Sequence, residues 1–101
     1  MKRGEVWWGT ALGKRRPYVI LTRETALPLL SEVVVAPATT TIRDIPSAVL
    51  LDRSDGMPDR CVVTLDHLLT VPKRSLRRRI TTLSGTRLDE ICEAMSYALG
   101  C

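Results

Sequence analysis

The chain has 101 residues, of which 45% are hydrophobic and 26% are charged, and its formal net charge is +4. These values are typical of one ordinary globular domain that spans residues 1–101 and has a single core. No apolar run approaches the roughly 20 residues that a membrane helix needs. The segment after Met1 lacks the apolar stretch of a signal peptide. We therefore expect a cytoplasmic protein without membrane contact.

The basic residues are 12 arginines and 3 lysines. Arginine suits bidentate contacts with phosphates and bases better than lysine does, so this excess fits a nucleic-acid partner. A GC-rich genome produces the same bias, and the charge therefore does not require such a partner. The three cysteines, Cys61, Cys92 and Cys101, have no C-x-x-C spacing. A zinc site or a disulfide scaffold is not expected. Cys61 and Cys92 are predicted to be small buried residues, and Cys101 to be an exposed thiol.

Short β-rich runs fill most of the chain, separated by proline-containing and glycine-containing turns. We predict strands at residues 5–10, 17–22, 32–37, 48–51, 60–65 and 78–82. Their number and spacing favour a small antiparallel barrel. The continuous apolar run at residues 18–21 is typical of a strand that is buried on both faces.

The C-terminal segment changes to a helical period. One apolar stripe is formed by Leu88, Ile91, Cys92, Met95, Ala98 and Leu99. Ser84 or Thr86 is a suitable N-cap, and Gly100 stands where a C-terminal glycine stop belongs. A single helix of about 13 residues is not stable alone, so we expect it to pack on the barrel.

A basic loop, Gly13-Lys14-Arg15-Arg16-Pro17, leads into the second predicted strand. Pro17 biases Arg16 toward an extended backbone and fixes the start of the strand. A guanidinium held there would match two phosphate oxygens. The alternative is a solvated basic turn.

A threonine run, Thr39-Thr40-Thr41, follows the third predicted strand, with Arg43 close behind. Its hydroxyls and Arg43 would serve as donors to a phosphate. The alternative is a run that reflects only β-propensity and turn hydrogen bonding.

His67 is the only histidine, and it follows Asp66. An acid–base mechanism that uses two histidines is therefore excluded. No nucleophile motif supports a Ser-His-Asp triad, and no cofactor-binding motif is present. Asp52, Asp55 and Asp59 lack the glycine and glutamate positions of a calcium loop, so we interpret them as a solvated acidic loop and expect no metal site.

A second basic block, residues 73–79, carries five cations in seven residues. It is typical either of a charged strand edge that resists aggregation or of a surface that follows an RNA backbone. Both interpretations remain open, and they are compatible.

The order of these segments resembles the MazF/PemK family of toxin endoribonucleases. The resemblance lies in Lys2-Arg3-Gly4-Glu5-Val6-Trp7, in residues 13–21, in Val33-Val34-Val35-Ala36-Pro37-Ala38-Thr39-Thr40, in Leu65-Asp66-His67, in residues 79–83 and in the final helix. It implies an SH3-like barrel of the MazF/PemK/CcdB type with a C-terminal helix, usually as a homodimer. It also implies metal-independent, cofactor-free cleavage of single-stranded RNA at short sequences, and inhibition by a cognate antitoxin.

The resemblance assigns catalysis to Arg16 and Thr39 and places Arg3, Asp66 and His67 near the RNA. Lys14, Arg15, Thr40 and Arg43 join the expected RNA-binding set as their neighbours. The implied products are a 2′,3′-cyclic phosphate and a 5′-hydroxyl. The homodimer would use residues 27–30 or the helix face, and the antitoxin would be an acidic, partly disordered segment that covers the basic groove.

The chain departs from the family pattern at two positions. The first loop, residues 10–16, is short, and His67 replaces what is commonly glutamine. Two rival functions share the same fold: a CcdB-like gyrase poison and an RNA-binding module without catalysis.

Overall fold

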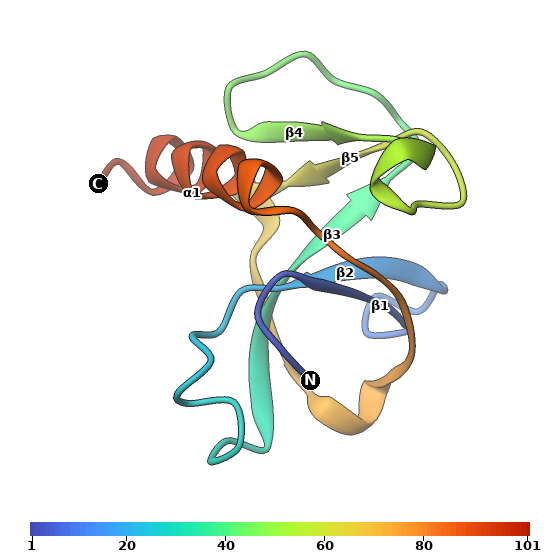
Figure 1. Cartoon of the computed structure of the whole chain (residues 1–101), viewed down its shortest axis with the longest axis vertical. Coiled ribbons are helices and arrows are strands. Elements are labelled where there is room, and N and C mark those ends of the chain that lie inside the picture. The colour runs from blue at the N-terminus through green and yellow to red at the C-terminus, as the bar shows by residue number, and fades with distance from the viewer.

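The computed structural model describes all residues, 1–101, as an antiparallel β-structure with one C-terminal helix (Figure 1). The strands are β1 (Glu5–Gly9), β2 (Arg16–Ile20), β3 (Glu32–Thr39), β4 (Ala48–Leu51), β5 (Cys61–Thr64), β6 (Leu69–Pro72) and β7 (Leu76–Thr82). The helix α1 spans Gly85–Leu99. Three short 3-10 turns, η1 (Arg53–Asp55), η2 (Leu65–His67) and η3 (Lys73–Ser75), connect the later strands. None of the helices is both long enough and apolar enough to cross a membrane.

The strands follow the order β4-β5-β3-β2-β1-β7, and β6 pairs with β3 outside this path. The long strand β3 pairs with β2 through residues 35–37, with β6 through residues 32–35 and with β5 through residues 38 and 39. No strand joins β7 to β4, so the predicted barrel is open rather than closed. All six predicted strands are present, with ends shifted by up to two residues, and β6 was not predicted.

Alternation along β2 and β3 fills two separate cores. Val19 of β2 belongs to a core of 14 residues that also contacts α1, whereas Tyr18 and Ile20 belong to a core of seven. In β3, Val33 and Val35 enter the smaller core while Ala36 and Ala38 enter the larger one. The prediction of a strand buried on both faces at residues 18–21 is confirmed.

The helix α1 packs on the larger core through Ile91 and Ala94. The Ser84 hydroxyl accepts a hydrogen bond from the Arg87 N–H at 3.3 Å, which makes Ser84 the N-cap. Gly100 ends the helix in the left-handed region, with φ of 73°. Both caps were among those predicted.

Surface exposure corrects two sequence interpretations. Leu27 is buried in the smaller core, so within the proposed dimer segment only Leu29 and Leu30 present large apolar side chains to solvent. Cys61 is buried as predicted, whereas Cys92 is only half-buried and its sulfur accepts a hydrogen bond from Arg3.

Glu5 is a buried carboxylate that links β1 to its surroundings. Its Oε1 accepts hydrogen bonds from the Lys2 N–H at 2.9 Å and from Trp7 Nε1 at 3.0 Å, and its Oε2 lies 3.3 Å from Arg79 Nη1. Burial alone would raise the pKa of Glu5, but these hydrogen bonds together hold the pKa below its ordinary value.

We expect Glu5→Gln to lower the free energy of unfolding near neutral pH by about 1.5–3 kcal/mol. A neutral amide oxygen accepts weaker hydrogen bonds than a carboxylate, and the amide NH2 cannot accept from Arg79. Since the folded pKa is lowered, the contribution of Glu5 is complete above its unfolded pKa and disappears as the pH falls through the folded pKa. Urea denaturation across this range measures both effects. Glu32→Gln, an exposed change of the same charge, is the control; equal losses in both variants would contradict the assignment.

Candidate functional site

Strand register brings the two predicted catalytic residues together. The antiparallel β2–β3 ladder ends at the pair Tyr18–Pro37, and Arg16 and Thr39 each lie two residues beyond this pair. Both residues therefore stand at the same end of the two strands. Their side chains line the same space there.

Two adjoining pockets meet at these residues. The first, which we call the Trp8 pocket, has a volume of about 390 Å³, and the second, the His67 pocket, about 330 Å³. The Trp8 pocket is lined by Trp8, Lys14, Arg15, Arg16, Pro17, Ala38, Thr39, Thr40, Thr41, Met57, Pro58, Asp59 and Cys61. The His67 pocket is lined by Arg16, Thr39, Thr41, Arg43, Ile45, Thr64, Asp66 and His67. Arg16, Thr39 and Thr41 thus form the boundary between the two.

The Arg16 guanidinium has no partner within the protein. Its Nε is buried without a hydrogen bond, and Arg16 takes part in none of the four ion pairs of the structure. A buried donor without a partner is costly unless a ligand supplies the acceptor. Arg16 is therefore available to an anion at the boundary of the two pockets.

The Thr39 hydroxyl is oriented by the turn that follows β3. Its Oγ1 accepts a hydrogen bond from the Thr41 N–H at 3.2 Å. This bond occupies one lone pair of the oxygen, and the hydroxyl hydrogen remains free to donate. Thr39 thus offers one donor to the space that Arg16 faces.

Trp8 is a site residue that the sequence interpretation treated only as part of a strand. The Arg15 guanidinium carbon lies 4.2 Å from the centre of the Trp8 ring, within the range of a cation–π contact. Alternation along β1 separates Trp7, which packs against the smaller core, from Trp8, which lines the pocket. The alternation of neighbouring residues along a strand is the sequence signal that could have placed Trp7 and Trp8 on opposite faces.

Asp66 and His67 lie in η2 and line the His67 pocket. Both are exposed, and the buried Ser47 hydroxyl donates a hydrogen bond to the Asp66 carboxylate. This bond links η2 to the residues just before β4. The His67 pocket therefore combines Arg43 with an acidic and an imidazole side chain.

The remaining wall of the Trp8 pocket comes from the β4–β5 loop and the start of β5. Met57, Pro58 and Asp59 belong to this loop, and Cys61 begins β5. Burial raises the pKa of the Cys61 thiol to about 11, so it stays protonated near neutral pH. Asp55 of the same loop has a side chain only 10% exposed and pairs with Arg87, which corrects the prediction of a wholly solvated acidic loop.

Arg3 is the one predicted site residue that lines neither pocket. Its Nη2 lies 3.5 Å from Cys92 Sγ of α1, so the side chain turns toward the helix. The cations of the 73–79 block also lie outside the two pockets; Arg77, Arg78 and Arg79 are exposed on β7, at one end of the sheet order. Of the two interpretations of this block, the position at the end of the sheet supports the charged strand edge.

Comparison of the chain with known proteins identifies its family. A family model described as "PemK-like, MazF-like toxin of type II toxin-antitoxin system" matches residues 2–99. The chain belongs to the PemK/MazF toxin family. The open antiparallel sheet and the C-terminal helix are therefore those of a MazF-type toxin.

Individual relatives agree along the whole chain. A protein named "Probable endoribonuclease MazF5" from Mycobacterium tuberculosis is 44% identical over 101 residues, which cover 98% of this chain and 93% of that protein. "Probable endoribonuclease MazF2" from the same organism is 38% identical over the full length of both proteins.

Solved structures show the same likeness. The Mycobacterium tuberculosis toxin MazF-mt6 has a TM-score of 0.88 and 35% identity, over 95% of this chain and 96% of that chain. An endoribonuclease in complex with its cognate antitoxin, from a Mycobacterial species, has a TM-score of 0.91 and 26% identity, over 99% and 95% of the two chains.

Proposed function

We propose that this MazF-type toxin is a sequence-specific, metal-independent endoribonuclease that cleaves single-stranded RNA by attack of a 2′-hydroxyl on the adjacent phosphorus. The products are a 2′,3′-cyclic phosphate and a 5′-hydroxyl. The observation that supports this most is the unpartnered guanidinium of Arg16 beside the Thr39 hydroxyl, at the boundary of two pockets. The endoribonuclease names of the full-length relatives agree with it.

Arg16 binds the scissile phosphate in this mechanism. The attack converts the phosphodiester into a pentavalent species with more negative charge on its non-bridging oxygens. A guanidinium already fixed at that position stabilises the added charge without reorganising during the reaction. The lack of an acidic partner matters here, because an ion pair within the protein would weaken this effect.

Thr39 orients the reacting groups. Because the Thr41 N–H holds the Thr39 oxygen, the free hydroxyl hydrogen points to a limited region of the site. A hydrogen bond from this hydroxyl to a phosphate oxygen would fix the phosphate against Arg16. Alignment of the 2′-oxygen with the leaving 5′-oxygen is a main requirement of such a reaction.

The pockets on either side would hold the flanking nucleotides. In the Trp8 pocket, the Trp8 ring offers a stacking surface and Lys14, Arg15 and Thr40 offer donors to the backbone. In the His67 pocket, Arg43 offers a further cation, and Asp66 and His67 offer an acceptor and an imidazole to base edges. Side chains of this variety support recognition of a short sequence rather than of phosphates alone.

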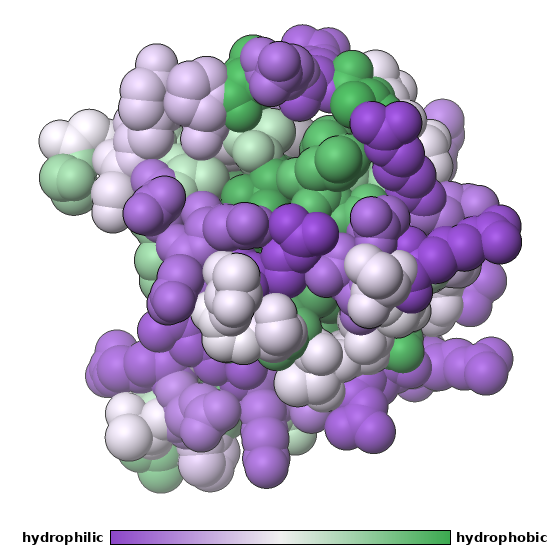
Figure 2. Space-filling view, turned by 45° about the horizontal axis from the view of Figure 1, so that its top comes forward, coloured by the Kyte–Doolittle hydropathy of each residue, from purple (hydrophilic) through white to green (hydrophobic).

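The proposed partners are the RNA, a cognate antitoxin and a second copy of the chain. The solved relative bound to its antitoxin supports the antitoxin. For the homodimer, one candidate surface is the groove between β4 and α1, lined in part by Leu50, Ala94 and Tyr97. Figure 2 shows apolar surface gathered in the part of the molecule that carries these elements, bordered by hydrophilic side chains. Exposed Leu29 and Leu30 form the other candidate.

The test is to incubate the purified chain with a long structured RNA in excess EDTA and to map the new ends. We expect cuts at one short sequence in unpaired regions, a cyclic phosphate on the upstream fragment and a 5′-hydroxyl on the downstream one. Loss of cleavage in EDTA that magnesium restores would contradict the metal-independent mechanism. Binding of RNA without cleavage would favour the non-catalytic module, and inhibition of gyrase supercoiling without RNA cleavage would favour the gyrase poison.

A further inference from the structure

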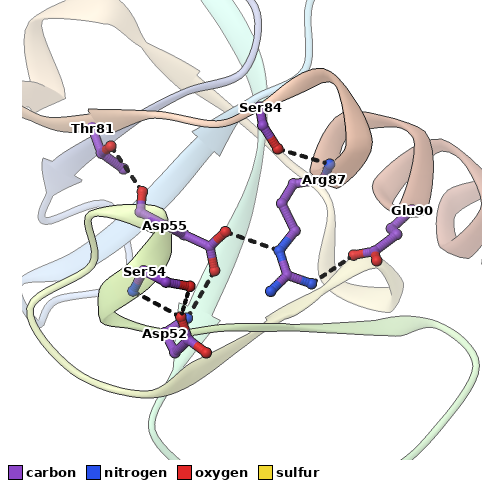
Figure 3. A network of polar contacts seen from close by, with 7 residues as sticks. All are labelled: Asp52, Ser54, Asp55, Thr81, Ser84, Arg87 and Glu90. Carbon is purple, nitrogen blue, oxygen red and sulfur yellow. Dashed lines mark hydrogen bonds and ion pairs between the residues drawn. The ribbon is translucent and has the colours of Figure 1, made fainter.

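The β4–β5 loop, which supplies one wall of the Trp8 pocket, is tied to α1 by an ion pair outside the pocket (Figure 3). Arg87 Nε donates to Asp55 Oδ1 at 2.9 Å, and Arg87 Nη1 lies 2.9 Å from Glu90 Oε2. The Asp55 side chain is only 10% exposed and that of Arg87 27% exposed. A pair with this much burial is less screened by solvent than an ordinary surface ion pair.

The loop has its own internal hydrogen bonds around the same carboxylate. The Asp52 N–H donates to Asp55 Oδ2 at 3.0 Å, and the Asp52 side chain accepts from the Ser54 N–H at 2.8 Å. Asp52 is the N-cap of η1, and its side chain and backbone form a capping box with Asp55 at N3. Asp55 therefore uses one oxygen to shape the loop and the other to join it to α1.

A third contact fixes the loop against β7. The Thr81 hydroxyl donates to the Asp55 carbonyl at 2.9 Å. Gly56 follows with a φ of +91°, and a Cβ at this position would overlap the Thr81 side chain. The backbone thus approaches β7 more closely than a larger residue allows, and Met57, Pro58 and Asp59 of the pocket wall come directly afterwards.

We propose that Asp55 and Arg87 are positioning residues that hold the β4–β5 loop in place as the wall of the Trp8 pocket, and so set how tightly the pocket binds the nucleotide next to the cleaved bond. This inference rests on the proposed ribonuclease function. Neither residue lines the pocket, and neither forms a hydrogen bond or an ion pair with Arg16 or Thr39. They act on substrate binding through the loop and leave the reacting groups unchanged.

The structure provides a charge-matched pair of variants. Asp55→Asn removes the partner of Arg87 on the loop, whereas Glu90→Gln removes its partner on the helix; each raises the net charge by one. For Asp55→Asn we expect KM for RNA to rise about fivefold or more, with kcat within about twofold of the wild type. Amide hydrogen exchange should become faster in residues 52–60 and stay unchanged in β2. Glu90→Gln should change none of these quantities by more than about twofold.

A double variant separates the ion pair from other effects of each residue. Arg87→Gln alone should reproduce the KM and exchange changes of Asp55→Asn, and adding it to Asp55→Asn should have little further effect. If Asp55→Asn does not fold, Arg87→Gln takes its place, because it leaves the capping box of the loop intact. Equal effects of Asp55→Asn and Glu90→Gln, or unchanged exchange in residues 52–60, would overturn the proposal. The exchange comparison decides it even if the wild-type chain cleaves no RNA, a result that would overturn the proposed function instead.

Discussion

Replacing Arg16 with alanine should lower kcat for RNA cleavage by about 10²–10³, the usual effect of removing one preorganised donor from a developing oxyanion. The guanidinium has no partner in the protein, so its removal breaks no ion pair and leaves no acidic group unpaired. We therefore expect the free energy of unfolding to stay close to that of the wild type. Single-turnover cleavage of a short fluorescent RNA, together with urea denaturation, measures both quantities.

Arg23→Ala is the matched control for this prediction. Arg23 is exposed, lies between β2 and β3 and lines neither pocket, and its loss changes the net charge by the same amount. Arg16→Lys keeps the charge but loses the fork that matches two phosphate oxygens, so its rate should fall between those of the wild type and Arg16→Ala. The assignment of Arg16 is wrong if Arg16→Ala cleaves at the wild-type rate, or if Arg23→Ala is equally slow.

Removing a single 2′-hydroxyl from the substrate, at the nucleotide before the cleaved bond, should abolish cleavage. The proposed nucleophile is that hydroxyl, so its removal takes away the attacking group of the reaction. Affinity should change little, because phosphate contacts dominate binding and are retained. An oligonucleotide with one deoxynucleotide, compared with the all-RNA sequence by cleavage and by competition, measures both effects.

The same substitution one nucleotide further along is the control, and it should leave cleavage nearly unchanged. Cleavage of the oligonucleotide deoxygenated at the cut site would rule out attack by the 2′-oxygen. In that case a protein side chain or water would have to supply the nucleophile. The end analysis would then give a linear phosphate rather than a cyclic one.

Local signals in the sequence were enough to predict most of the fold. The strand at residues 48–51 has the predicted bounds, and Ser84 and Gly100 cap the helix as expected. Strand β6 was missed because four residues are too few for their alternation to stand out, and they become a strand by pairing with β3. The predicted SH3-like arrangement is confirmed, but strand spacing did not reveal that the sheet stays open between β7 and β4.

The residues of the candidate site also differ in whether a local sequence pattern could indicate them. Arg16 and Thr39 could be singled out in the sequence because each stands at the end of a recognisable strand, and the family resemblance supplied their expected role. The part played by Trp8 depends on which face of β1 meets the pocket, and the burial of Asp55 depends on Arg87, which lies 32 residues away and approaches only through packing of α1. The position of Arg3 against Cys92 likewise depends on that packing. Tertiary contacts of this kind leave no mark in a local pattern.

Residues of β2 alternate between the two cores, so the direction of the Arg16 side chain and the stability of the domain depend on the same strand register. A one-residue slip anywhere between Arg16 and Ile20 would turn the guanidinium to the opposite side of the sheet, and it would also exchange the residues destined for the two cores. An insertion or deletion in this segment is therefore expected to prevent folding, whatever its effect on activity. The segment can vary by substitution but not in length, whereas the exposed β1–β2 loop that carries Lys14 and Arg15 into the Trp8 pocket is free to change length.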